Sequence, residues 1–387
     1  MKSFFRHERV VRLRLASTLT AVALLSSCGG GGSSATGAPG ALRLALTDGP
    51  ACGFDHVYVT IESVRVHASA SAEESDAGWT DIPLAEKRRV DLLTLTNGAL
   101  TELGTTALPA GRYQQVRLVL AANEAGASAM ANAVLPTGST EERPLGAPGG
   151  QGGSSIKIPA EIEVAADATA DFVLDFDACK SVAAAGRDGT YQLKPVITVV
   201  PRSASGIEGV LADELAANTT IVSAQRDGIS IRSTRPDASG RFSIPFLEPG
   251  SYSLVIASEA HATGVVTDVP VHAGMTIVGQ PATAIALPRS PAREITGAVT
   301  LNTESDAGAS APSPFTEGLV RAAQQLAGGH SFEVRSRPLD AVAGTYRLTV
   351  PTAAPMRAAY AGSGALSFVP DATDAGRYSV DVLIAAE

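Results

Sequence analysis

The carboxylates best placed to do chemistry in this 387-residue sequence gather in one short run, DFVLDFD at residues 171–177. If the run forms a strand, alternate side chains point to opposite faces. Asp171, Asp175 and Asp177 then share one face, while both phenylalanines and the leucine share the other. Ca²⁺ prefers several carboxylate oxygens as ligands. With Asp48 or Asp55 nearby, this face is a candidate calcium site.

The same carboxylates have a competing role as partners of basic residues. Lys180, Lys194 and Arg117 are candidates to pair with Asp175 or Asp177. Charged side chains are rarely buried unless they are paired. We favour the ion pairs over the calcium site and predict no metal ion or other cofactor.

Motifs for enzyme chemistry are missing from the sequence. It has no HExxH, GxSxG, P-loop or dinucleotide fingerprint. The six histidines are scattered without metal-ligand spacing, so each is interpreted as a surface or packing residue. These observations predict a protein that is not an enzyme. The alternative is an enzyme with an unrecognised site.

The N-terminus has the parts of a secretory signal. A basic segment precedes an apolar stretch at residues 16–25, which is too short to span a bilayer. Residues 25–28, LSSC, resemble the lipobox of bacterial lipoprotein signals. That resemblance implies cleavage before Cys28, lipidation of its thiol and new amine and, because Gly29 follows, delivery to the outer membrane. The alternative is an ordinary secretory signal whose cysteine is incidental.

Two further cysteines, Cys52 and Cys179, remain in the mature chain. The periplasm is oxidising, so a leftover pair there favours a disulfide. The alternatives are a metal ligand or a reactive thiol, but neither cysteine has a CxxC partner or a histidine cluster. We predict that Cys52 and Cys179 form a disulfide.

Short strands dominate the expected secondary structure. Residues 56–66, HVYVTIESVRV, alternate apolar and polar side chains, and similar runs recur between Gly, Pro and Asp turns. This pattern is typical of β-sandwiches. The best helical pattern is TEGLVRAAQQL at residues 316–326, with Leu319, Ala322, Ala323 and Leu326 on one face and Thr316 as cap.

A Gly-x-Tyr phrase takes five of the seven tyrosines. Glycine allows a turn at positive φ, and the tyrosine then begins a strand with its ring inward and its hydroxyl near the corner backbone. The alternative is a carbohydrate-stacking platform of exposed rings. We favour a structural role for Tyr113, Tyr191, Tyr252, Tyr346 and Tyr378.

The predicted fold is all-β, with tandem antiparallel β-sandwiches of Ig-like or prealbumin-like type. Residues 1–28 are the lipoprotein signal and residues 29–40 a Gly/Ser-rich tether. Linkers containing Pro-Arg-Ser separate the rest into domains at 41–202, 206–287 and 291–387, the last being a diverged second copy of the middle one.

Two family resemblances follow from local motifs. Residues 41–201 resemble the bacterial lipoprotein domain of unknown function family 4382, through LTDGP at 46–50, WTDI at 79–82, LPAGRYQQVRLVL at 108–120 and YQLKPVI at 191–197. Residues 206–287 resemble the carboxypeptidase regulatory-like, or transthyretin-like, sandwich of the carbohydrate-binding-like fold, through DASGRFSI at 237–244 and LEPGSY at 247–252. The second resemblance implies a non-catalytic module.

Together these features predict a non-catalytic lipoprotein of the outer membrane that binds or scaffolds at the cell envelope. Its expected partners are the membrane, through the lipid anchor, and an envelope protein or a glycan. Carbohydrate binding is the more specific alternative. The formal net charge of −9 at pH 7 argues against nucleic acid as a partner.

Overall fold

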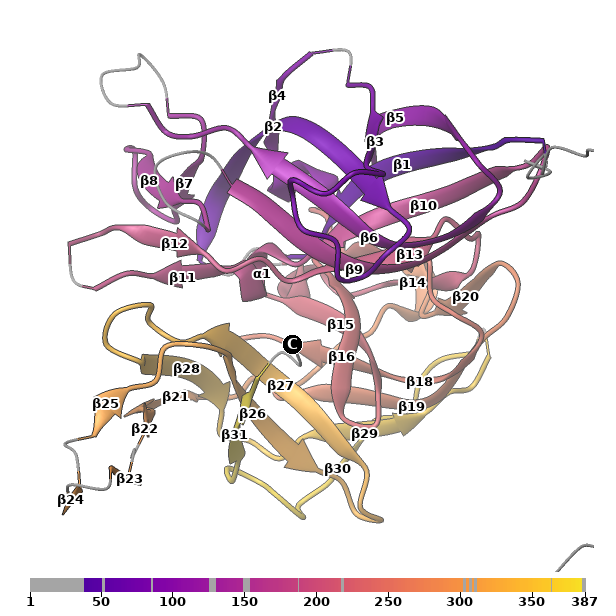
Figure 1. Cartoon of the computed structure of the whole chain (residues 1–387). Coiled ribbons are helices and arrows are strands. Elements are labelled where there is room, and N and C mark those ends of the chain that lie inside the picture. Colours follow the sequence, from indigo (N-terminus) through magenta and orange to yellow (C-terminus); the bar gives the residue numbers. More distant parts are fainter. Residues whose placement is uncertain are drawn as a thin grey trace, which may run out of the picture. The chain divides into compact units, whose positions relative to one another are not determined.

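The computed structural model describes residues 38–50, 53–84, 86–124, 130–148, 154–186, 188–216, 219–301, 304–305, 308–309, 312–362 and 364–384. Strands dominate these residues, as Figure 1 shows, and helices are limited to single short turns. The predicted all-β fold is therefore confirmed. Gly37–Glu387 form one compact unit. Within the described part, no helix is long and apolar enough to cross a membrane.

The first module, residues 40–201, contains two sheets. One has the strand order β13-β10-β1-β5 and the other β11-β12-β8-β7-β2-β6-β9, with β3 and β4 paired to β2. The elements are β1 (Gly40–Asp48), β2 (Phe54–His67), β3 (Thr80–Ile82), β4 (Arg88–Asp91), η1 (Leu92–Leu95), β5 (Thr101–Leu108), β6 (Gly111–Leu120), β7 (Ala133–Pro136), β8 (Arg143–Gly146), β9 (Ser154–Val164), β10 (Thr169–Phe176), α1 (Ala178–Ser181), β11 (Val182–Ala184), β12 (Tyr191–Leu193) and β13 (Ile197–Pro201).

The second module, residues 206–287, begins with β14 and contributes a three-stranded sheet, β17-β14-β20, and most of a six-stranded one, β16-β15-β18-β19-β29-β30. Its own elements are β14 (Gly206–Val210), η2 (Asp213–Leu215), β15 (Ile221–Arg226), β16 (Ile229–Thr234), β17 (Arg241–Pro245), β18 (Gly250–Ala257), β19 (Gly264–Val271), β20 (Met275–Val278) and η3 (Pro281–Thr283).

The third module, residues 292–384, has the sheets β27-β26-β31 and β21-β28 together with small two-stranded pairs. Its elements are β21 (Ala292–Ala298), β22 (Thr300–Leu301), β23 (Glu304–Ser305), β24 (Gly308–Ala309), β25 (Ser313–Pro314), β26 (Leu319–Gln325), β27 (Ser331–Pro338), β28 (Thr345–Pro351), β29 (Met356–Ala359), β30 (Val369–Pro370) and β31 (Ser379–Leu383).

Strand β2 shows how local pattern produces the core. Val57, Val59 and Ile61 alternate inward, as predicted, and are buried in the first-module core. A register shift between Ile61 and Ser63 changes the inward set to Val64 and the residues after it. The extra residue of a bulge rotates the side chains that follow it. One long strand can thereby keep its apolar face on a curved core.

The sheets are mixed rather than purely antiparallel, which corrects the prediction. β1 pairs in parallel with β10, β8 with β12, β14 with β20 and β19 with β29. Parallel neighbours need a long crossover between them. The segment between β1 and β10 includes the strands of the other sheet, so it supplies such a crossover.

The boundary between the second and third modules also needs correction. β29 and β30 belong in sequence to the third module, yet β29 pairs with β19 of the second. Met356 and Phe368 pack against the second-module core. The second sandwich is therefore extended by a strand from beyond residue 291, and the last predicted domain is not self-contained.

The predicted helix at 316–326 is wrong, because strand β26 (Leu319–Gln325) occupies most of this segment. Its neighbours β27 and β31 supply backbone partners on both sides. A register shift between Ala322 and Ala323 leaves both alanines buried, and Leu326 is buried beyond them. Two successive inward residues in a bulged strand imitate the three-and-four spacing of an amphipathic helix.

An Asn-Gly turn joins the first module to the second. Asn97 adopts a left-handed φ of 56°, and its Oδ1 accepts hydrogen bonds from Thr234 Oγ1 and Ser243 N, both at 3.0 Å. Gly98 has a φ of 79°, and a Cβ there would lie 2.9 Å from Pro245 Cγ. Both the backbone conformation and the close approach require glycine.

We predict that Gly98→Ala lowers the thermal midpoint more than Gly138→Ala does. Gly138 has a similar φ of 81°, but its Cβ would meet nothing within 4 Å. Both variants add left-handed strain of about 1–3 kcal/mol, and only Gly98→Ala adds the clash with Pro245. Differential scanning calorimetry measures the difference. Equal midpoints for the two variants would contradict a tight contact between the turn and Pro245.

Candidate functional site

The acidic run at the end of β10 is engaged in ion pairs. Asp175 lies 3.1 Å from Arg232 of the second module, and both side chains are largely buried. Asp177 pairs with Lys180 at 3.1 Å and also caps α1 by accepting a hydrogen bond from the Lys180 backbone N–H. Asp171 pairs with Arg43. These contacts use the carboxylates in the way the ion-pair alternative describes.

Of the remaining candidates, only Asp48 lies beside the acidic run, where β1 pairs with β10. Asp55 accepts a hydrogen bond from Thr137 and Asp48 one from Ala178. Lys194 instead pairs with Glu317 at 3.3 Å, and Arg117 donates to Ala72 O. Among the residues that the structure describes, no group of three or more His, Cys, Asp or Glu side chains is arranged to hold a metal ion.

Sequence reasoning correctly named Lys180 as a partner of this cluster, but it missed the arginines that reach the cluster from the other modules. Arg232 follows the acidic run by more than fifty residues and reaches it only because the modules dock. Arg337, from the third module, donates to Cys179 Sγ at 2.7 Å. Burial lowers the pKa of Arg337 to about 9. Burial alone would also lower the pKa of Lys180, but Asp177 and Glu333 raise it above its ordinary value.

The predicted disulfide cannot be placed directly, because Cys52 lies outside the described residues. Cys179 is buried in α1. Pro50 and Cys179 line the same small cavity, and Asp48 Oδ1 accepts a hydrogen bond from Ala178 N at 3.0 Å. The chain just before Cys52 therefore lies beside Cys179. The pairing of the two cysteines stays a prediction that this proximity supports.

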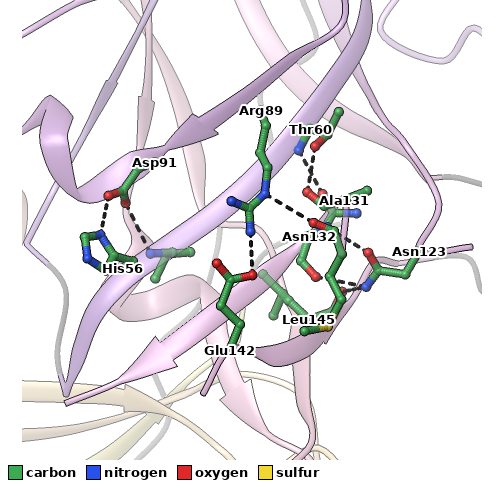
Figure 2. Close-up of polar contacts among 11 residues, drawn as sticks. His56, Thr60, Arg89, Asp91, Asn123, Ala131, Asn132, Glu142 and Leu145 are labelled. Atoms are coloured by element: carbon green, nitrogen blue, oxygen red, sulfur yellow. Dashed lines mark hydrogen bonds and ion pairs between the residues drawn. The ribbon is translucent and has the colours of Figure 1, made fainter. Parts of the chain in front are cut away.

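A second polar cluster covers the outer face of β2, as Figure 2 shows. Asp91 accepts from the His56 ring at 2.6 Å and from Val57 N at 3.3 Å. Arg89 pairs with Glu142 at 2.7 Å and stacks 3.7 Å above the Tyr58 ring. These contacts connect β2 to β4 and to the segment before β8, so the cluster has a structural role.

Asparagine side chains extend the same network. Asn132 Oδ1 accepts from Thr60 N at 2.9 Å, and Asn123 Oδ1 accepts from Asn132 N at 2.7 Å. Asn123 Nδ2 in turn donates to Leu145 O at 3.2 Å. The paired amides replace regular strand pairing where the chain leaves β6 and enters β7.

The Gly-x-Tyr phrases separate into two structural groups. In the first, Tyr113 and Tyr252 are 7% and 2% exposed, and their hydroxyls donate to the carbonyls of Pro109 and Glu248, four residues earlier. Both phrases carry a leucine three residues before the glycine and a proline between them, LPAG and LEPG. This is the tyrosine-corner arrangement in which the hydroxyl satisfies upstream backbone.

In the second group the rings are only half-buried. Tyr191 opens β12, Tyr346 is the second residue of β28, and Tyr378 directly precedes β31. Tyr378 donates to Pro351 O at 2.5 Å, and burial raises its pKa. Tyr191 and Tyr346 share a longer phrase, Gly-Thr-Tyr-x-Leu, and make no hydroxyl hydrogen bond to any described residue.

An open groove brings Tyr191 and Tyr346 together, and we take it as the candidate functional site. Its volume is about 570 Å³, which is within the range of small-ligand sites. Phe54 contacts Tyr191 edge to face with ring centroids 5.3 Å apart. Thr296, Gly297 and Ala298 of β21 line it, together with Asp340 and Arg347 of the third module.

The groove wall is held by hydrogen bonds between the first and third modules. Ala341 N donates to Ala184 O at 2.8 Å, and Gly186 N donates to Asp340 Oδ2 at 3.1 Å. Burial alone would raise the pKa of Asp340, but N–H donors from Ala343, Val342 and Gly186 lower it. Asp340 is therefore a charged, structurally fixed part of the wall.

Residues 39–195 match the family described as domain of unknown function (DUF4382), which confirms the first resemblance. No curated protein matches the sequence. Two solved structures are similar to this chain at a TM-score of 0.17, too low to support an argument. "The Bacillus anthracis TIE protein" is 14% identical and covers 81% of this chain, which spans 44% of that protein. "Structure of the Streptococcal ancillary pilin" is 7% identical, and the match covers 90% of this chain and 96% of the pilin chain.

We predict that Tyr252→Ala lowers the free energy of unfolding by about 3–5 kcal/mol, because a fully buried ring leaves a cavity. Tyr252→Phe should cost less, about 0.5–1.5 kcal/mol for each of the two hydroxyl hydrogen bonds, one donated to Glu248 O and one accepted from Arg226. Tyr191→Ala serves as the comparison, and its half-buried ring predicts a smaller loss. Urea unfolding midpoints measure all three. A larger loss for Tyr191→Ala than for Tyr252→Ala would contradict the division into two groups.

We predict that Asp48 makes the stability pH-dependent. Burial raises the pKa of Asp48 well above its ordinary value, with Asp177 and Asp175 adding to the increase. The folded state then holds a proton that the unfolded state releases, so the free energy of unfolding falls as pH rises above the ordinary aspartate range. Asp48→Asn keeps the Oδ1 acceptor for Ala178 and removes this term. The urea midpoint of Asp48→Asn should therefore exceed that of wild type by a margin that grows from pH 4 to 8. A difference that stays constant over this range would refute the prediction.

Proposed function

We propose that this protein is a non-catalytic lipoprotein, anchored in the outer membrane through Cys28, that binds or scaffolds at the cell envelope. Cys28 itself lies outside the described residues, so the anchor rests on the lipobox resemblance. We also propose that residues 206–287 form a carboxypeptidase regulatory-like module, as their turn motifs suggest. Modules of this kind are usually non-catalytic.

One observation carries the non-catalytic proposal: buried charged and polar side chains form contacts between the modules. Asp175 and Arg232 pair across the first and second modules. Gln225 exchanges two hydrogen bonds of 2.8 Å with the Glu333 backbone across the second and third. Groups engaged in this way hold a multi-module body in one arrangement, which suits scaffolding or presentation of a binding surface.

Carbohydrate binding is the second candidate function. The open groove with Phe54, Tyr191 and Tyr346 favours it, because half-buried aromatic rings offer flat apolar faces beside polar groups. The two candidates are compatible, since a scaffold can carry a glycan site.

We predict that Cys28→Ala removes the protein from the membrane fraction or leaves it unprocessed. A single acyl chain binds membranes only marginally and several hold stably, so loss of the lipidated cysteine removes the anchor. Metabolic labelling with palmitate followed by envelope fractionation measures this. Wild-type protein that never incorporates palmitate would show that the lipobox interpretation is wrong.

The binding proposal is tested by cross-linking and affinity capture from intact envelope. Wild-type protein should recover specific envelope proteins or glycans that Cys28→Ala protein, released from the membrane, recovers less well. The Asp48→Asn variant controls for general effects of substitution, because it alters a buried group remote from the lipid anchor in sequence. Identical recovery from wild type and Cys28→Ala would contradict a role that depends on anchoring.

A further inference from the structure

We propose that the groove between β12, β21 and β28 is a saccharide-binding site in which the rings of Tyr191 and Tyr346 stack on sugar rings. This inference rests on the carbohydrate-binding candidate stated above and assigns it a place and named residues. The site belongs to neither sandwich alone, because its walls come from the first and third modules.

The position of the Tyr346 ring depends on its cross-strand neighbour, which is a glycine. Gly297 lies directly opposite it in the β21–β28 pair, and a Cβ at Gly297 would come within 2.5 Å of the Tyr346 hydroxyl and 2.7 Å of its Cζ. The ring therefore lies over the glycine and packs one side toward the third-module core. As a lining residue of the groove, Tyr346 also presents surface to the open side.

Tyr191, from the first module, is the second tyrosine of the groove lining. It packs against the first-module core and is fixed by its edge-to-face contact with Phe54. Its hydroxyl, like that of Tyr346, makes no hydrogen bond within the described residues. Unlike the corner tyrosines, both residues are only partly buried and line an open groove.

The polar groups around the rings suit a polyhydroxylated ligand. Thr296, Thr345 and Arg347 are also among the lining residues, and Arg347 pairs with Glu294 at 2.6 Å. A pyranose has an apolar face of C–H groups, which complements the electron-rich face of an aromatic ring, and hydroxyls at its edge. An apolar floor with a few placed polar groups is the usual composition of a ligand site.

The experiment titrates full-length mature protein with soluble cello-, malto-, xylo- and chito-tetraoses by isothermal titration calorimetry. We expect at least one tetrasaccharide to bind, and we expect Tyr191→Ala and Tyr346→Ala each to weaken it about tenfold or more. Tyr252→Phe, outside the groove, should bind like wild type.

Ala298→Arg keeps the proposal testable if a tyrosine variant fails to fold. Ala298 is exposed in the groove lining, so the arginine blocks the groove without changing the core, and binding should be lost. Undiminished binding in Ala298→Arg and in the folded alanine variants would overturn the groove site. Carbohydrate binding at another site would then remain the conclusion. A wild-type protein that binds none of the four tetrasaccharides overturns both, and leaves the proposed lipid anchor untouched.

Discussion

The arrangement of the modules depends on the ion pair between Asp175 and Arg232. Both side chains are largely buried, and they come from different modules. A charge taken out of water is costly unless it is paired, and removing one partner leaves the other uncompensated. Burial raises the pKa of Asp175 and the charge of Arg232 opposes that increase, so Arg232 is the group that favours the ionised carboxylate. Separation of the first two modules would break this ion pair.

Other contacts extend the same constraint to the third module. Gln225 bonds to the Glu333 backbone, and β29 extends the second sandwich by pairing in parallel with β19. Arg337 reaches α1, next to the acidic run. The three segments that resemble separate domains in the sequence therefore share strands and buried charges. The aromatic groove exists only because the first and third modules meet in this way.

The Gly-x-Tyr motif occurs in two structural roles. A glycine followed by a tyrosine two residues later makes a turn and starts a strand at nearly every occurrence. At Tyr113 and Tyr252 the hydroxyl completes the corner, and the ring joins the core of its own module. At Tyr191 and Tyr346 the following strands lie at a module junction, so the rings are only half-covered. The shared Gly-Thr-Tyr-x-Leu motif is the sequence signal that distinguishes this pair.

The sequence by itself determined the properties that depend on neighbouring residues. Alternation in β2 and the turn residues between runs specified an all-β chain, because side chains in a strand alternate with period two. Local pattern failed where a bulge made β26 resemble a helix, since pairing with β27 and β31 decided its conformation. Tertiary structure alone selected Arg232 over Lys194 and Arg117 as the partner of Asp175, and it alone placed β29 beside β19. Those choices follow from how distant segments dock, and the spacing of residues along the chain does not encode which distant charges or strand edges will meet.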